Sequence, residues 1–128
     1  MIRSFLAIIV VLVFSSMAYA AQEQVSAKEI KVLLSGNSII GTWFGEEYKQ
    51  YFAENGATIY SPKKAQSSPG EWRVNEAENT YESIWQSGQW TGYRIVKEDG
   101  NYFWLGDRNV PQPFKVVKGR QIIWIPDE

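Results

Sequence analysis

The chain has 128 residues, and its 13 Lys and Arg nearly balance its 14 Asp and Glu, giving a formal net charge of −1. Nucleic acids and anionic lipids select clustered basic residues, so this balance argues against both as partners. The sequence has no His and no Cys, and therefore lacks an imidazole base, the commonest zinc and copper ligands, and any disulfide. We expect no metal and no cofactor.

Residues 1–20 have the order of a secretory signal peptide. Arg3 supplies a positive start, Phe5–Phe14 form an apolar run, and Ala18-Tyr19-Ala20 places small residues where a signal peptidase cleaves. The apolar run is about half the length that a membrane-spanning helix needs, and no later segment is apolar enough to span. We therefore predict cleavage after Ala20, a periplasmic or secreted location, and no membrane span in the cleaved product.

The remaining residues, 21–128, fit a single domain, and it begins with a short helix at about 26–35. Ser26 and Glu29 have the spacing of a capping box, in which each side chain bonds a free backbone group of the first turn. The apolar side chains that follow share one helix face: Ile30, Leu33 and Leu34.

From Ser38 onward, short runs of β-branched and aromatic residues alternate with turn residues. We predict nine strands, near 38–44, 47–54, 57–61, 70–75, 80–86, 90–97, 101–105, 114–118 and 121–125. Short turns link many of them: Asn55-Gly56 (predicted as a type I′ turn), Ser87-Gly88, Asp99-Gly100 and Lys118-Gly119-Arg120. Such short links allow only antiparallel neighbours. The prediction is an all-β antiparallel meander of eight or nine strands that closes into a small barrel or half-open barrel.

A short motif on the first predicted strand, Gly41-Thr42-Trp43, resembles the G-x-W found at the start of lipocalins and avidins. In those barrels the Trp closes one end, often beneath a basic side chain from the last strand. The resemblance implies a lipocalin-like barrel with structural roles for Trp43 and Arg120. The alternative is an ordinary core Trp that follows a Gly at a bend.

A longer pattern covers most of the predicted domain. It comprises Leu34-x-Gly36-Asn37-Ser38, Gly41-x-Trp43, Tyr48-x-x-Tyr51-Phe52, Gly56, Tyr60, Gly70-x-Trp72, Tyr81-x-Ser83-x-Trp85 and Trp90-x-x-Tyr93. This pattern resembles a family of short secreted proteobacterial domains of uncharacterised function, with a lipocalin-like β architecture. Many members carry Cys where this chain has Glu82 and Gly92, so the resemblance implies that a cross-strand disulfide is missing here. The matched residues are mostly aromatic residues, Gly and turn formers, and they bear on the fold only.

No catalytic constellation stands out in the sequence. Glu46 and Glu47 are adjacent, so on a strand they would face opposite sides of the sheet. A Ser nucleophile would have no His as its base. We therefore expect that the protein is not an enzyme.

The abundant aromatic residues leave two functional hypotheses. The first is a carrier or sensor that holds a small apolar or aromatic ligand in the mouth of the barrel. The second is an envelope module without a ligand, which binds a protein or a glycan through exposed aromatic side chains. For the first, the predicted ligand-binding residues are Tyr48, Phe52, Trp85, Trp90, Tyr93 and, as a polar anchor, Arg94. Strand alternation places Tyr93 on the opposite face from Trp90 and Arg94, so barrel curvature would have to bring this set together.

Overall fold

A computed structural model describes residues 22–126 of the chain; the predicted signal peptide lies outside the described residues. The helix is α1 (Ala27–Leu34). The strands are β1 (Glu23–Gln24), β2 (Asn37–Trp43), β3 (Glu46–Phe52), β4 (Ala57–Pro62), β5 (Ser68–Asn75), β6 (Thr80–Trp85), β7 (Thr91–Glu98), β8 (Asn101–Leu105) and β9 (Gln112–Lys118).

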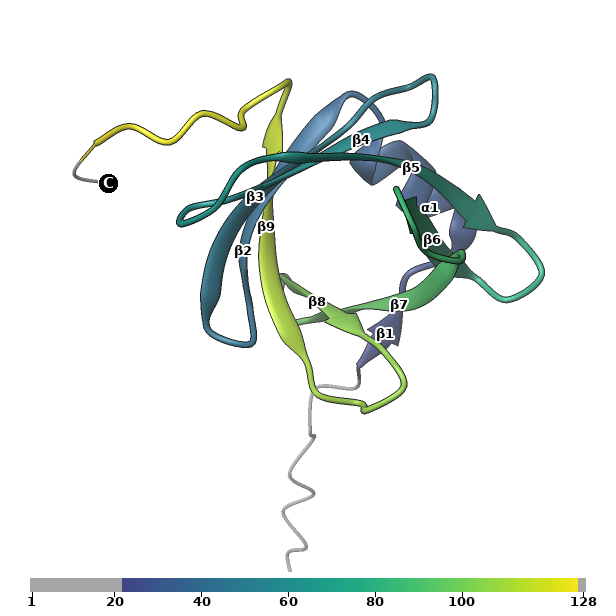
Figure 1. Cartoon of the computed structure of the whole chain (residues 1–128). Coiled ribbons are helices and arrows are strands. Elements are labelled where there is room, and N and C mark those ends of the chain that lie inside the picture. Colours follow the sequence, from purple (N-terminus) through teal and green to yellow (C-terminus); the bar gives the residue numbers. More distant parts are fainter. Residues whose placement is uncertain (1–21, 127–128) are drawn as a thin grey trace, which may run out of the picture.

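Strands β2 to β9 form a closed antiparallel barrel in simple up-and-down order. Each strand pairs with the next one along the chain, and β9 closes the ring by pairing with β2 (Figure 1). This confirms the predicted all-β antiparallel barrel with one short helix. Closure leaves these eight strands without a free sheet edge along most of their length, which protects them from pairing with other chains.

The wall between β6 and β7 is short and is extended by β1. Only three residue pairs join β6 to β7, from Tyr81↔Tyr93 to Ser83↔Thr91. Farther along β7, where β6 has diverged, the two residues of β1 pair with Val96 and Lys97. The N-terminal strand, which was not predicted, therefore fills an edge that the barrel itself leaves open.

Two of the hairpins have the backbone of a two-residue type I′ turn, with positive φ at both central residues. Asp99-Gly100 has φ values of 50° and 80°, and Phe44-Gly45 has 47° and 87°. The type I′ prediction for Asn55-Gly56 is wrong, because only Gly56 has a positive φ. The connection between β3 and β4 is longer than two residues, and the amide of Gly56 donates to the carbonyl of Ala53 at 3.1 Å.

The predicted last strand at 121–125 is wrong, since the structure has no strand there and the segment pairs with no other strand. At Gly119 the chain leaves the barrel wall because the Ser38 hydroxyl donates to the carbonyl of Gly119 and accepts from the amide of Gln121. The segment then crosses the outside of β3 and β4, where Lys49 Nζ donates to the carbonyl of Ile123 and Trp124 Nε1 donates to the carbonyl of Ser61.

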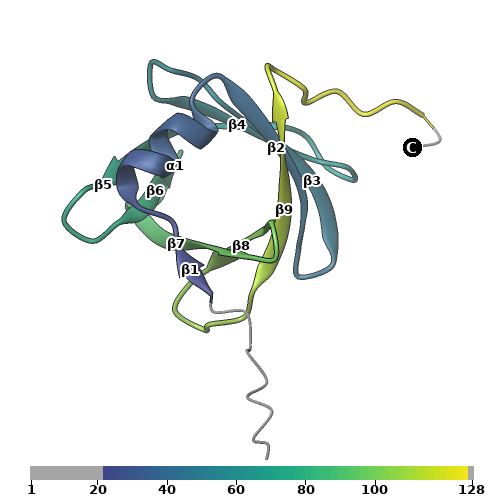
Figure 2. The same ribbon diagram turned by 180° about the vertical axis from the view of Figure 1, so that it is seen from behind.

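Helix α1 packs against one end of the barrel, beside β5, β6 and the start of β2 (Figure 2). It begins as predicted, with the Ser26 hydroxyl accepting from the amide of Glu29 at 3.2 Å. Its buried face, Ile30 and Leu34, joins Val25 and inward side chains of the strands in one apolar core, with Ile39, Tyr48, Phe52, Trp72, Tyr81, Ile95, Trp104 and Phe114 from the strands. This end of the barrel is filled. Among residues 22–126, no helix is long and apolar enough to cross a membrane.

Candidate functional site

The barrel is hollow at the end away from α1. Inward side chains there surround a cavity of about 450 Å³, within the range of small-molecule sites. The cavity is lined by Trp43, Tyr48, Gln50, Tyr60, Ser68, Tyr81, Ser83, Trp85, Tyr93 and Trp104. None of these lining residues carries a formal charge at neutral pH, so the cavity presents mainly aromatic surface with a few hydroxyl and amide groups.

The aromatic walls of the cavity support one another through ring contacts. Trp43 meets Tyr93 edge to face, with ring centroids 5.5 Å apart. On the opposite wall, Tyr60 contacts both Tyr48 and Trp85, with centroid distances of 5.0 and 6.1 Å. Edge-to-face and tilted pairs are the arrangements that aromatic rings favour. The walls are therefore fixed in place without a ligand.

Polar groups at the base of the cavity form a buried hydrogen-bond network. Gln50 Nε2 donates to Thr58 Oγ1 at 3.0 Å and to the Tyr81 hydroxyl at 3.2 Å. Trp104 Nε1 donates to the Tyr48 hydroxyl at 3.0 Å. These side chains are almost fully buried, with Tyr48 2% and Gln50 6% exposed. Because a buried network is stable only when its members are paired, it holds the cavity base in one geometry.

Two tyrosines of this network keep their protons far into the alkaline range. Burial raises the pKa of Tyr48 and the pKa of Tyr81 well above the usual value for a phenol, about 10, because the phenolate would lose its hydration. Hydrogen bonds from neighbouring side chains offset this effect only in part. Burial also raises the pKa of Tyr60 and of Tyr93, helped by the carboxylates of Glu46 and Asp107 respectively.

We expect the stability of the barrel to fall as the pH rises above about 10. There the unfolded chain releases the protons of Tyr48 and Tyr81 while the folded chain keeps them, so unfolding becomes easier by up to about 1.4 kcal/mol per pH unit for each. Denaturant unfolding over about pH 9–11 measures the slope. Tyr81→Phe should make this slope shallower. An equal slope in the two proteins would contradict the assignment.

Three of the predicted ligand-binding residues line the cavity: Tyr48, Trp85 and Tyr93. Phe52 also points into the barrel, but it lies deeper, in the filled core near α1. Its ring contacts Trp72 and Tyr81 at centroid distances of 5.5 and 5.7 Å, and it is fully buried. Phe52 therefore supports the cavity base without lining the cavity.

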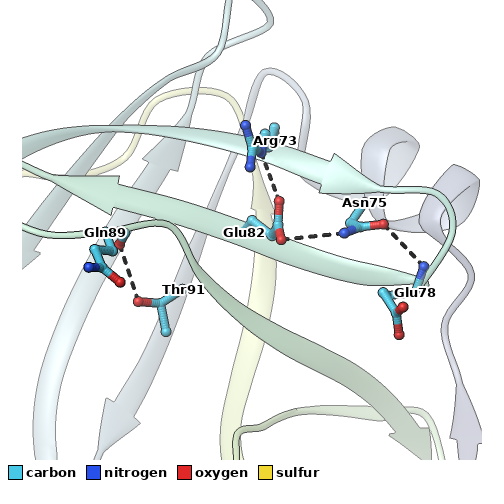
Figure 3. A network of polar contacts seen from close by, with 6 residues as sticks. All are labelled: Arg73, Asn75, Glu78, Glu82, Gln89 and Thr91. Atoms are coloured by element: carbon cyan, nitrogen blue, oxygen red, sulfur yellow. Dashed lines mark hydrogen bonds and ion pairs between the residues drawn. The ribbon is translucent and has the colours of Figure 1, made fainter.

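The other two predicted residues, Trp90 and Arg94, lie on the outside of the barrel. The guanidinium of Arg73 stacks on the Trp90 ring at 3.8 Å. The same guanidinium pairs with Glu82 at 2.7 Å (Figure 3). Arg94 donates to Asn109 Oδ1 at 2.8 Å. Strand alternation separates Trp90 and Arg94 from Tyr93, and the curvature of the barrel does not bring them together.

The implied pairing of Trp43 with Arg120 is not present. Trp43 ends β2 at the hollow end of the barrel, whereas Arg120 follows Lys118, which pairs with Asn37 at the start of β2. The two side chains thus lie at opposite ends of one strand. Arg120 is exposed, 5.8 Å from the ring of Tyr51, and Trp43 lines the cavity instead of closing the filled end.

The sequence analysis did not predict a site role for six of the residues that line the cavity: Gln50, Tyr60, Ser68, Tyr81, Ser83 and Trp104. Alternation along β3 does place Gln50 on the same face as Tyr48, and alternation along β6 places Ser83 with Trp85. The missing information was which strands face each other across the barrel, since Trp104 lies 56 residues from its partner Tyr48.

The cavity has to be interpreted from its own chemistry. No protein-family model, curated protein or solved structure matches the chain. Within residues 22–126, no three carboxylates come close enough together to hold a metal ion. Glu82 and Gly92, the two positions at which the sequence resemblance implied a missing disulfide, are direct partners on β6 and β7. The cavity remains the most developed site on the described part of the chain.

Proposed function

We propose that this chain is an exported binding protein that holds a small, largely aromatic or apolar molecule in its barrel cavity. The observation that carries the proposal is the cavity itself, about 450 Å³ with seven aromatic residues among its ten lining residues. Water in such a cavity touches mainly ring faces, so a flat apolar ligand that replaces it gains hydrophobic contact. The ring contacts fix the walls in advance, so little ordering has to accompany binding.

The lining residues support binding in preference to catalysis. A general base needs a pKa near the working pH, and a nucleophile needs such a base beside it. The cavity offers two Ser hydroxyls and four Tyr phenols, and burial raises the pKa of Tyr48 and Tyr81 further from neutrality. A group poised to exchange protons at neutral pH is absent among these ten residues. We infer that the protein binds its ligand without transforming it.

The contacts of the outer aromatic residues make the envelope-module hypothesis the weaker one. The Trp90 ring lies under Arg73, the Trp124 ring lies 4.4 Å from Lys49 Nζ, and both Trp residues are only partly exposed. A residue that binds a partner through its ring face needs that face free. These rings already use a face within the chain, whereas the rings of the cavity face an open volume.

Titration with an apolar fluorescent probe tests the proposed function. We expect saturable binding that quenches part of the Trp emission. Trp85→Ala removes a wall of the cavity and should weaken binding at least tenfold, the equivalent of about 1.4 kcal/mol. Trp90→Ala removes the same side chain from the outer face and should bind the probe like the unsubstituted protein. A folded protein that binds no probe, or equal losses in both variants, would contradict the proposal.

A further inference from the structure

The base of the cavity has hydrogen-bonding capacity that the protein does not use. The orientation of the Gln50 amide follows from its neighbour. Thr58 donates its only hydroxyl hydrogen to the carbonyl of Tyr51 at 2.8 Å, so it can only accept from Gln50. The amide nitrogen must therefore face Thr58, and its second hydrogen reaches the Tyr81 hydroxyl. Both hydrogens of Gln50 Nε2 are used.

The oxygen of the same amide is free to accept. No described residue donates to Gln50 Oε1, although Gln50 is only 6% exposed. Every side-chain nitrogen or oxygen that is sealed from solvent among the described residues has a partner. Gln50 Oε1 must therefore remain accessible, and the space that Gln50 lines is the cavity. Its two lone pairs form an acceptor at the base of an aromatic enclosure.

Two donors lie beside this acceptor. The Tyr48 hydroxyl accepts from Trp104 Nε1, and no described residue accepts the hydrogen of Tyr48 in return. The Tyr81 hydroxyl accepts from Gln50 and has the Ser83 hydroxyl as a neighbour. The hydroxyls of Tyr81 and Ser83 carry one hydrogen each, and a hydrogen bond between them uses only one of the two. The other hydrogen is free to bond a ligand. The base thus offers two hydroxyl hydrogens and one amide oxygen.

The charges around the cavity select against an anionic ligand. No Lys or Arg is among the lining residues. At the hollow end, Glu46 is the direct cross-strand partner of Trp43 and so shares its face of the sheet. Asp107 follows Gly106, whose backbone lies against the ring of Tyr93. A carboxylate ligand would therefore lose its hydration without meeting a cation in the cavity, at a cost that buried charges rarely recover.

We propose that the ligand has a flat apolar body and an uncharged head group that both donates and accepts hydrogen bonds, such as a carboxamide or a lactam. This inference rests on the proposed function and specifies its ligand class. The head lies at the base, with its carbonyl accepting from the Tyr48 hydroxyl and its N–H donating to Gln50 Oε1. The body lies between the rings of Tyr60, Trp85 and Tyr93. A head that only accepts or only donates leaves buried groups without partners, which costs affinity.

Three probes with one ring system and different heads test this inference: 2-naphthamide, 2-methylnaphthalene and 2-naphthoate. In isothermal titration of the full barrel, 2-naphthamide should bind at least tenfold more tightly than 2-methylnaphthalene. 2-Naphthoate should bind most weakly of the three. Tyr48→Phe keeps the ring and removes one donor, and it should reduce the ratio of the 2-naphthamide to the 2-methylnaphthalene affinity about tenfold. Tyr51→Phe makes the same change on the outer face and should leave this ratio unchanged.

The outcomes separate the two proposals. If 2-methylnaphthalene binds as tightly as 2-naphthamide and Tyr48→Phe leaves the ratio unchanged, the cavity binds apolar molecules and the head-group inference is wrong. If 2-naphthoate binds most tightly, the charge argument is wrong as well. If a folded protein binds none of the three probes, the proposed function itself fails. A ratio of affinities is used because a loss of stability in the variant weakens both probes alike.

Discussion

Replacing Phe52 by Ala is expected to lower the free energy of unfolding by about 3–5 kcal/mol, the usual cost of truncating a large aromatic residue in a core. Phe52 is fully buried where β3 ends beneath α1, and it packs edge to face on both Trp72 and Tyr81. Closed strands and a capping helix surround it, so the structure cannot easily collapse into the space left behind. Denaturant unfolding of both proteins measures the loss.

Two variants serve as controls for this result. Trp43→Ala removes a larger ring, but Trp43 lines the cavity and is only partly buried, so its cost should be clearly smaller. Val32→Ala lies on the exposed face of α1, where the side chain is 75% exposed, and should change stability by less than about 0.5 kcal/mol. If Trp43→Ala proves as costly as Phe52→Ala, the filled core extends to both ends of the barrel and the cavity is wrongly placed.

Gly41→Ala should be strongly destabilising although it adds only one methyl group, with an expected cost of about 1–3 kcal/mol or more. A Cβ atom at Gly41 would lie 2.5 Å from the carbonyl oxygen of Pro113 and 3.0 Å from Phe114 Cβ. The first of these atoms belongs to the backbone of β9, which cannot rotate away. Since β2 and β9 together close the barrel, the strain acts on the pairing that completes the ring.

Gly88→Ala is the matched control. The nearest atom to a Cβ at Gly88 is the carbonyl oxygen of Trp85 at 3.7 Å, an ordinary contact, and its φ is not in the left-handed region. Thermal or denaturant unfolding should place Gly88→Ala within about 0.5 kcal/mol of the unsubstituted protein. Equal stability of the two Ala variants would show that β9 can shift at Gly41, contrary to the geometry described above.

The fold could be predicted because local signals agree with one another along most of the chain. Asp99-Gly100 can adopt positive φ at both residues, and the structure uses it as a two-residue hairpin. Phe44-Gly45 does the same with a bulky residue that sequence rules disfavour. That turn depends on a distant contact, because the amide of Phe44 donates to Gln112 Oε1 at 2.7 Å. A turn that is stabilised by a residue far away in the sequence, as at Phe44-Gly45, cannot be recognised from its neighbouring residues.

The sequence predicts which face of a strand a site residue lies on, but not how deep in the barrel its side chain lies. Alternation correctly places Tyr48 and Phe52 on the same side of β3, and both point inward. Only the position of α1 decides that Tyr48 lines open space whereas Phe52 is sealed in the core. The pairing of Trp43 with Arg120 failed for a related reason, because the analogy placed them without the strand register. Register and depth arise from long-range packing, and a single sequence does not encode them in a readable pattern.

The short wall between β6 and β7 has a consequence for how quickly the cavity can exchange its contents. Tyr81, Ser83 and Tyr93 lie both on this three-pair seam and on the cavity lining. Separating these strands breaks few backbone bonds, so local opening there should need far less free energy than global unfolding. The Arg73–Glu82 ion pair links only β5 to β6, the stacking of Arg73 on Trp90 reaches the residue before β7, and β1 reinforces β7 beyond the seam. A molecule in the cavity then has a lateral exit through the wall. Its residence time depends on how often β6 and β7 separate, as well as on its affinity.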